Sequence, residues 1–451
     1  MIKKWFIRFL KIFTLMLIIF ISGAVYVYYQ YVDYFTIPKT RLGINDFYPV
    51  MPPDKTHIYM EFPVDHNDPN CGKFKGFYIL SPDFVSGKDV IFILTDGQQN
   101  KVHPEINLNF QFEDLKKLSY VLIGRRGHYP TLFPEVYNRD GSLDYKKAIK
   151  LYGTDQQIED IELVRRDLQN KGYLSKDGKI MLHGRSGAGV LLQQYIAKYP
   201  ENVSRALIEA SGGPDIAIKN NISLCNFNEQ MKISNLETIK KLNDILKNKK
   251  IDRVALCYIL FKLPYFNING KELRIKLIDE IYENDFTSYY KYWWSPENNF
   301  YFMKFMMQFP MMEATKIRML EIVGRTLAEY SKNNEEINLE FEWLNEILKD
   351  YLLKLSEGTI KINDINLMNE RSKYTGEVLV LAATEDQVMP YKLGELTARA
   401  YSKSKFALFK DTHAFIIEKQ YYYDIRKTFF EKGLYSKELQ ELLSDKRQLY
   451  K

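Results

Sequence analysis

Cysteine is scarce in this chain, with 3 among 451 residues. Cys71, Cys225 and Cys257 form no C-x-x-C pair and lie beside no histidine cluster, which argues against a structural zinc site. In one interpretation, Cys225 and Cys257 form a disulfide in a domain outside the cytosol. In the other, all three are buried thiols. Neither a metal nor an organic cofactor is expected.

An excess of charge of one sign is also missing. The chain has 63 lysines and arginines against 57 aspartates and glutamates, a net charge of +6. Four of the positive charges crowd the extreme N-terminus, at Lys3, Lys4, Arg8 and Lys11, so the remainder is close to neutral. A nucleic-acid partner is therefore not expected. Repeats and low-complexity tracts are lacking too, and the length suits one large domain or two.

One long uncharged run is present, at residues 12–32. A membrane helix needs about 20 such residues. Basic residues precede the run and four tyrosines lie near its end, which predicts a single pass with the N-terminus in the cytoplasm. The rest of the chain would then lie in the periplasm or at the cell surface. The alternative is a cleaved signal peptide, with Ser22-Gly23-Ala24 as the small-residue site.

Short apolar runs alternate with helical patterns from residue 56 onward. Residues 90–94 and 120–123 are continuously apolar, as in strands buried on both faces. Residues 154–157 resemble a capping box that opens a helix reaching residue 168. The alternation predicts a mostly parallel sheet flanked by helices. The other expected strands are residues 58–62 and 74–80, as antiparallel edge strands, and 180–183, 206–208, 378–382 and 406–409.

Ser186 has the most informative surroundings in the sequence. It follows the apolar run 180–183 and lies between Gly184-Arg185 and Gly187-Ala188, ahead of an amphipathic helical pattern. A tight strand-to-helix turn needs such small neighbours, and it leaves the serine at its apex. Ala188 occupies the last position of the G-x-S-x-G pattern and still meets the steric requirement. The run predicts a nucleophile elbow.

A serine nucleophile needs a base, and the base needs an acid. Of six histidines, only His413 follows Ser186 in the chain. The acid is expected after the strand at 378–382, where Asp386 is the first choice and Glu385 the second. Ser186, Asp386 and His413 are therefore the predicted catalytic triad.

The strand pattern stops between residues 214 and 375, where helical periodicity takes over. We expect a large inserted helical lid over Ser186. Residues 301–319 contain six of the 14 methionines among many aromatic residues. They form either an adaptable apolar wall of a substrate cleft or ordinary lid core. The expected divisions are a membrane anchor at 1–35, a linker at 36–55, the first part of the core at 56–213, the lid at 214–375 and the second part of the core at 376–451.

Several local runs agree with one family. Residues 62–69, 125–127, 154–168, 386–390 and 412–414 resemble the proline iminopeptidase and tripeptidyl aminopeptidase branch of the α/β-hydrolases. The resemblance covers about residues 55–213 and 375–430. It implies the α/β-hydrolase fold and a serine peptidase that acts on peptide N-termini without a cofactor.

Two runs depart from the pattern of that branch. Asp96-Gly97-Gln98-Gln99 stands where the branch has G-G-P-G, and Gly124 replaces the aspartate of its D-Q-R-G run. Aligned with the branch, the amides of Gly97 and Gly187 form the oxyanion hole. The charge of Asp96 would oppose a nearby oxyanion unless the side chain points away.

Three functions follow from these patterns. The first is a membrane-anchored aminopeptidase whose lid carboxylates, with Glu297 and Glu313 as candidates, hold a substrate ammonium group. The second is a carboxylesterase or lipase, favoured by the apolar lid and the membrane anchor. The third is a binding protein on an impaired hydrolase scaffold, favoured by the altered loop at 96–99. The substrate is a small peptide or ester whose identity depends on the lid and loops rather than the fold.

Overall fold

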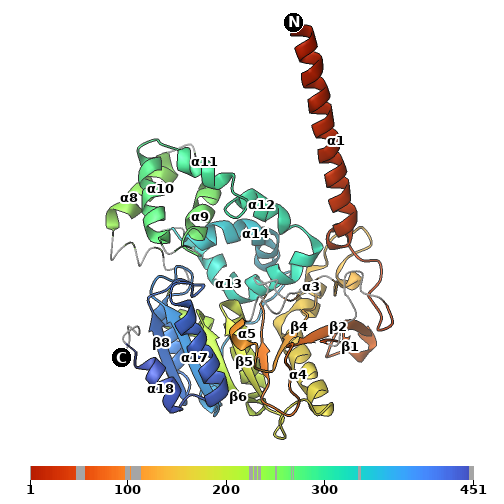
Figure 1. Cartoon of the computed structure of the whole chain (residues 1–451), viewed down its shortest axis with the longest axis vertical. Coiled ribbons are helices and arrows are strands. Elements are labelled where there is room, and N and C mark those ends of the chain that lie inside the picture. Colours follow the sequence, from red (N-terminus) through yellow and green to blue (C-terminus); the bar gives the residue numbers. More distant parts are fainter. Residues whose placement is uncertain are drawn as a thin grey trace.

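The computed structural model describes residues 2–46, 56–96, 102, 113–128, 130–222, 227, 231, 235–248, 251–265, 267, 269–333 and 337–445. Within them, eight strands form one sheet in the order β1-β2-β4-β3-β5-β6-β7-β8 (Figure 1). The pairs β1–β2 and β2–β4 are antiparallel and the others parallel. The strands are β1 (His57–Pro63), β2 (Lys73–Leu80), β3 (Ile91–Ile93), β4 (Tyr120–Ile123), β5 (Ile180–Arg185), β6 (Val203–Glu209), β7 (Glu377–Ala383) and β8 (Ser404–Phe409).

The mostly parallel sheet predicted from the sequence is confirmed, with one correction. A strand lies at each predicted run, but β2 is not an edge strand, because it pairs with β1 on one side and β4 on the other. β5 lies near the middle of the sheet, with Leu182 opposite Phe92 on β3 and Ala206 on β6. The residues that follow β5 are therefore at the centre of the sheet's carboxyl edge.

Both faces of the sheet are covered by helices. Leu182 points into one apolar core, which it shares with α4 (Thr154–Asn170) and α5 (Gly187–Lys198). Its neighbour Met181 points into another, which it shares with α17 (Lys419–Lys432). Because neighbouring strand residues face opposite sides and both sides are buried, the strands are apolar without alternation. The remaining helices of the core are α3 (Tyr145–Tyr152), α16 (Tyr391–Arg399) and α18 (Lys437–Leu443).

The start of α4 differs from the expected capping box. Gly153 is the N-cap, without a side-chain bond, and Thr154 is the first helical residue. Glu321, distant in sequence, accepts from the Thr154 amide at 3.0 Å and from its hydroxyl. The orphan amide at the helix start is thus satisfied by a carboxylate from another helix rather than by a local side chain.

A helical insertion separates β6 from β7. Its first helix begins at Pro214 and its last ends at Lys373. The two ends are tied together by a buried ion pair between Arg371 and Asp215, with two contacts of 2.8 Å. In Figure 1 the insertion lies above the sheet, on the side where β5 leads into α5. Its helices are α6 (Pro214–Lys219), α8 (Leu236–Asn248), α9 (Arg253–Lys262), α10 (Gly270–Tyr282), α11 (Thr287–Trp293), α12 (Phe300–Met306), α13 (Glu313–Asn333), α14 (Leu339–Ser356) and α15 (Met368–Lys373).

The insertion has two parts with different packing. We call α13 and α14 the inner half, because Ile317, Leu320 and Tyr351 join the apolar core that Leu182 shares with α4 and α5. We call α8 to α12 the outer half, which packs mainly around an apolar core of its own together with residues of α14. The inner half thus packs on two sides, against the hydrolase core through residues such as Leu320 and against the outer half through residues such as Leu348.

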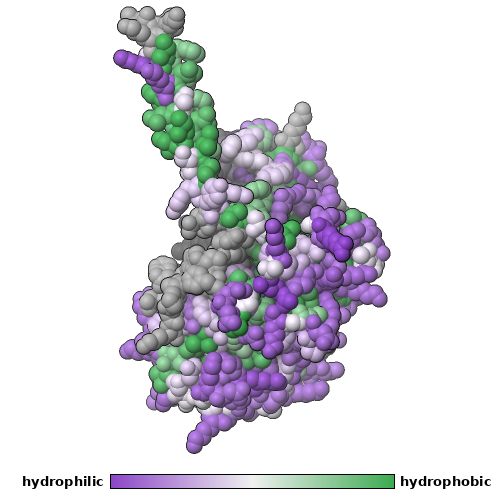
Figure 2. Space-filling model, turned by 90° about the vertical axis from the view of Figure 1, so that its right-hand side faces the viewer, coloured by the Kyte–Doolittle hydropathy of each residue, from purple (hydrophilic) through white to green (hydrophobic). Residues whose placement is uncertain are grey.

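The N-terminus forms one long helix, α1 (Ile2–Phe35), that projects from the molecule (Figure 1). Its segment Trp5–Tyr29 has a mean hydropathy of 2.2 and none of its most apolar window is buried. In Figure 2, most of α1 is hydrophobic, whereas the surface below it is largely hydrophilic. By length and composition it is able to cross a membrane, a property that signal sequences share.

Candidate active site

Ser186 lies in the strained turn between β5 and α5. Its backbone has φ 55° and ψ −129°, a conformation that costs a non-glycine residue of order 1–3 kcal/mol. Two hydrogen bonds hold the turn: the Ser186 amide donates to Glu209 O at 2.9 Å, and Ser211 Oγ donates to Ser186 O at 2.6 Å. A side chain on Gly184 would collide with the backbone of Ala188, so the turn requires small neighbours. This is the geometry of a nucleophile elbow.

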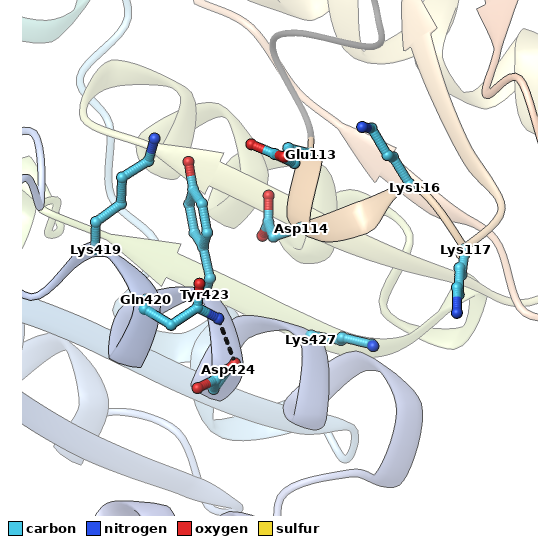
Figure 3. A pocket seen from close by; sticks show the side chains of 9 residues that line it. All are labelled: Glu113, Asp114, Lys116, Lys117, Lys419, Gln420, Tyr423, Asp424 and Lys427. Carbon is cyan, nitrogen blue, oxygen red and sulfur yellow. Dashed lines mark hydrogen bonds between the residues drawn. The ribbon is translucent and has the colours of Figure 1, made fainter.

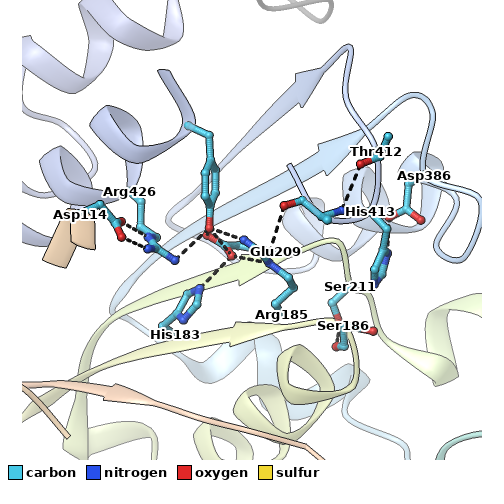
Figure 4. Close-up of polar contacts among 12 residues, drawn as sticks. Asp114, His183, Arg185, Ser186, Glu209, Ser211, Asp386, Thr412, His413 and Arg426 are labelled. Carbon is cyan, nitrogen blue, oxygen red and sulfur yellow. Dashed lines mark hydrogen bonds and ion pairs between the residues drawn. The ribbon is translucent and has the colours of Figure 1, made fainter. Parts of the chain in front are cut away.

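Asp386 and His413 follow the next two strands and meet beside the elbow. Asp386 Oδ2 lies 2.8 Å from His413 Nδ1, and its Oδ1 accepts from the amides of Val388 and Met389 at 2.9 Å. This arrangement places a proton on Nδ1 and leaves Nε2 as the base. Nε2 is buried and makes no hydrogen bond among the described residues. Figure 4 shows the imidazole turned toward Ser186.

The alternative acid, Glu385, contacts other groups than His413. Its amide donates to Asp411 O at 3.0 Å, and its carboxylate contacts the hydroxyl of Thr384 at 3.3 Å. Asp386 is 1% exposed and faces the histidine. The geometry thus favours Asp386, and the catalytic roles of all three triad residues stay predictions.

Arg185, directly before the nucleophile, links the elbow to the histidine turn. It donates to Ala414 O at 3.3 Å and to Glu209 at 3.1 Å, and its guanidinium lies 5.3 Å from the ring centre of Tyr422. Burial alone would raise the pKa of Glu209, but His183 and Arg185 bring it well below its ordinary value. The carboxylate is therefore charged, and it forms hydrogen bonds with both His183 and Arg185 (Figure 4). The sequence showed Arg185 only as the variable position of the motif.

The predicted oxyanion residues have different outcomes. Gly187 is the first residue of α5, where a helix presents unpaired amides toward the reacting atom. Gly97, together with Gln98 and Gln99, lies outside the described residues. Asp96 is described and packs so closely against Gly187 that any side chain there would collide with its carboxylate. A buried charge thus lies beside one predicted oxyanion donor.

Arg318 on α13 forms a buried ion pair with Asp96. Its Nε lies 3.1 Å from both carboxylate oxygens of Asp96, and both side chains are nearly inaccessible to solvent. The same guanidinium donates to Thr154 Oγ1 at 2.6 Å. Burial lowers the pKa of the nearby Arg125 to about 10, and Asp96 opposes that shift. Asp96 is therefore neutralised by a residue that sequence patterns did not single out.

The insertion also places a carboxyl group and a ring near the triad. Burial, and then the charge of Asp386, raise the pKa of Glu340 on α14 to about 8. Glu340 is therefore largely protonated at neutral pH. The ring of Tyr265, which follows α9, lies 4.8 Å from the imidazole of His413. Both were missed from the sequence because the lid has no recognisable motif.

The chain has the α/β-hydrolase fold. The observations that decide it are the strand order with antiparallel β2, the strained serine turn after β5, and the hydrogen-bonded pair of Asp386 after β7 and His413 after β8. The predicted fold class is thus confirmed.

Solved structures with this fold are numerous among the structural matches. A meta-cleavage product hydrolase from Pseudomonas fluorescens IP01 is 15% identical, with 80% of this chain and 96% of that chain covered and a TM-score of 0.39. A serine hydrolase from Cycloclasticus zankles is 11% identical, with 84% and 100% covered and a TM-score of 0.40. An alpha/beta fold family hydrolase from Bacillus anthracis is 13% identical, with 84% and 99% covered and a TM-score of 0.39. No family model and no curated protein matches the sequence. These likenesses concern the fold alone.

The other candidates have mixed outcomes. Glu313 accepts from Lys316 and Tyr351, each at 2.7 Å, so its oxygens are occupied, whereas Glu297 is exposed on the lid.

Cys257 is buried in α9 and Cys225 lies outside the described residues, so their pairing stays a prediction. No group of three or more metal-ligating side chains occurs among the described residues. In the run 301–319, Met307 and Met319 are buried in lid core whereas Phe302 and Phe305 are exposed.

A polar groove of about 570 Å³ lies apart from this site. The short helix η2 (Glu113–Leu115) contributes Glu113, and α17 contributes Lys419 and Asp424 (Figure 3). No residue of the predicted triad lines it. Because its lining mixes acidic side chains with lysines, the groove does not favour a purely anionic or a purely cationic ligand.

Proposed function

We propose that the chain is a membrane-anchored serine hydrolase that cleaves an amide or ester bond through an acyl-enzyme. The observation that carries the proposal is the 2.8 Å hydrogen bond between Asp386 and His413 beside a serine in the elbow conformation. Buried groups with this mutual geometry serve acyl transfer.

The chemistry uses these residues in two steps. His413 Nε2 takes the proton of Ser186 as Oγ attacks the substrate carbonyl, and the same proton then passes to the leaving amine or alcohol. Water hydrolyses the acyl-enzyme by the same route in reverse. The Gly187 amide stabilises the oxyanion, with Gly97 as the second predicted donor.

Two substrate classes remain as proposals. An aminopeptidase is supported by Glu340, because a substrate ammonium group would favour the ionised form of this buried carboxyl. A carboxylesterase or lipase is supported by the exposed aromatic residues of the outer half, such as Phe302 and Phe305. Aminoacyl anilides and acyl esters, offered to the same preparation, separate the two classes.

A fluorophosphonate probe tests the reaction itself. The full-length protein in detergent should be labelled, and Ser186→Ala should lose the label and all hydrolysis while its melting temperature stays close to that of the parent. Ser372→Ala is the control and should keep the label, because Ser372 is exposed and its hydroxyl donates to Asn369 O within the insertion. A labelled Ser186→Ala protein would assign the nucleophile to another serine, and an unlabelled parent would leave only the binding-protein alternative.

The anchor and its orientation are a further part of the proposal. The length and hydropathy of Trp5–Tyr29 support a membrane span, and four basic residues at its N-terminal end, against Lys39 and Arg41 after it, favour a cytoplasmic N-terminus. Protease added to intact cells should cleave the hydrolase domain. Cleavage only after lysis would place the domain in the cytoplasm, and a mature protein without its first residues would identify a signal peptide.

A further inference from the structure

The outer half of the insertion carries five exposed aromatic side chains on and beside α11 and α12. Trp294 is 78% exposed, Phe305 55% and Phe302 51%. Several large exposed rings on two helices in contact are uncommon in a domain that contacts only water, and they mark contact sites. We call Tyr290, Trp294, Tyr301, Phe302 and Phe305 the aromatic face.

Ring contacts connect the aromatic face to the end of α1. Phe305 packs on Phe309 with ring centres 5.1 Å apart, and Phe309 packs on Phe35 at 4.4 Å. At the other end, Tyr301 packs on Trp293 at 5.4 Å, which joins α12 to α11. The last residue of α1 is therefore part of the same aromatic surface as the lid.

The position along α1 brings this surface to the outer edge of the lipid head-group layer. Phe35 is six residues beyond Tyr29, the end of the apolar segment, which is about 9 Å along a helix. The head-group layer extends roughly 5–8 Å beyond the hydrocarbon on each side. In Figure 1, α11 and α12 lie on the side of the domain toward which α1 projects. An α1 that crosses a bilayer thus carries the aromatic face against it.

Tryptophan and tyrosine favour this layer because each combines an apolar ring with a polar group. We propose that the aromatic face rests in the head-group layer of the membrane that holds α1. The proposal rests on the proposed membrane anchor, and it adds a second membrane contact, made by the lid. The outer half then lies between the bilayer and the triad, because Tyr265 after α9 contacts His413. Substrates that partition into the membrane would reach the site from this side.

Tryptophan quenching by brominated lipid tests the contact without using activity. The full chain carries Trp5→Phe to remove the tryptophan of α1, and is reconstituted in phosphatidylcholine vesicles with and without bromines on the acyl chains. Trp294 should be quenched, and a further Trp294→Phe change should remove more than half of the quenching. Trp343, which is 6% exposed inside the lid, is the internal reference.

A paired variant tests the consequence for substrate. Phe302→Glu with Phe305→Glu should lift the face from the bilayer, because charged groups are costly at the acyl boundary. It should lower hydrolysis of an acyl ester held in vesicles by about five- to tenfold and leave a water-soluble ester unaffected. Tyr435→Glu, at a 60% exposed aromatic residue outside the insertion, should change neither rate.

The outcomes separate the proposals. Absence of protein from the vesicle fraction would refute the anchor. Protein in the vesicles whose quenching is the same with and without Trp294 would overturn the docking proposal, whether or not the protein hydrolyses esters. Fluorescence that changes with protein density but not with brominated lipid would place a second copy of the chain on the face, and would also overturn it.

Discussion

In the sheet core, each residue of the predicted triad follows a strand, whereas the helical insertion reaches the site through side chains on the flanks of its helices. The turn after β5 holds Ser186 in a conformation set by backbone hydrogen bonds. Arg318 on α13 instead pairs with the charge of Asp96, and Glu340 on α14 is a buried carboxyl whose pKa is raised by burial and by Asp386. The core therefore supplies the groups that would react, and the inner half supplies the electrostatic surroundings in which they would do so.

The two halves of the insertion differ as well. The inner half shares its apolar core with the sheet and is tied to it by the pair between Arg318 and Asp96. The outer half packs within itself and against α14, away from the sheet, and exposes Trp294 and Phe302. One inserted segment thus contains a fixed part of the site and a surface turned outward. Substitutions in the core and in the inner half test this division.

The largest effect is expected in the core, at the acid. Asp386→Asn should lower kcat by about 10⁴-fold, because an amide facing His413 Nδ1 favours the tautomer that cannot accept the serine proton. Glu385→Gln should stay within a few-fold of the parent. Steady-state rates on one ester and one anilide measure both. Equal losses, or a larger loss at Glu385, would assign the acid to the wrong carboxylate.

A smaller effect is expected in the inner half, at Arg318. Arg318→Met removes the guanidinium that is hydrogen-bonded to the buried Asp96, which should cost about 3–5 kcal/mol of unfolding free energy. Activity should fall by about 10²-fold, because the charge of Asp96 beside the predicted oxyanion donor is then less compensated.

A second substitution shows whether that loss is electrostatic. The double variant Arg318→Met with Asp96→Asn should recover much of both losses, as measured by thermal unfolding and kcat. Arg325→Met, an exposed position on the same helix, is the control and should cost less than about 1 kcal/mol. No recovery in the double variant would mean that Arg318 acts by packing rather than by its charge.

A third effect is expected at Glu340 and depends on pH. Its pKa is about 8 in the folded chain against an ordinary value of 4.5, so the unfolded state ionises first as pH rises. Between pH 4.5 and 8 the parent should lose up to about 1.4 kcal/mol of stability per pH unit from this group. Glu340→Gln removes that loss. The difference in melting temperature between variant and parent should therefore grow from pH 5 to pH 8, and a constant difference would show that Glu340 is not buried as described.

Local patterns were enough to predict much of the core from the sequence. Runs such as residues 120–123 predict strands because a strand covered on both faces must be apolar throughout. The surroundings of Ser186 predict the elbow because the turn itself demands small neighbours. The order of chemistry-bearing residues along the chain then left His413 as the one eligible histidine. Each inference used residues close in sequence or their order.

Long-range contacts decided the rest. The capping box expected at Thr154 was wrong because Glu321, 167 residues away, satisfies that helix start. Asp96 was expected to oppose an oxyanion, and only the folded chain places Arg318 against it, 222 residues along. A carboxyl group such as Glu340 has an ordinary pKa until burial removes its water. The sequence by itself determined the sheet and the candidates for reaction, because these depend on local periodicity and chain order. The tertiary structure alone decided the charges around them, because partners and burial arise only when distant segments pack.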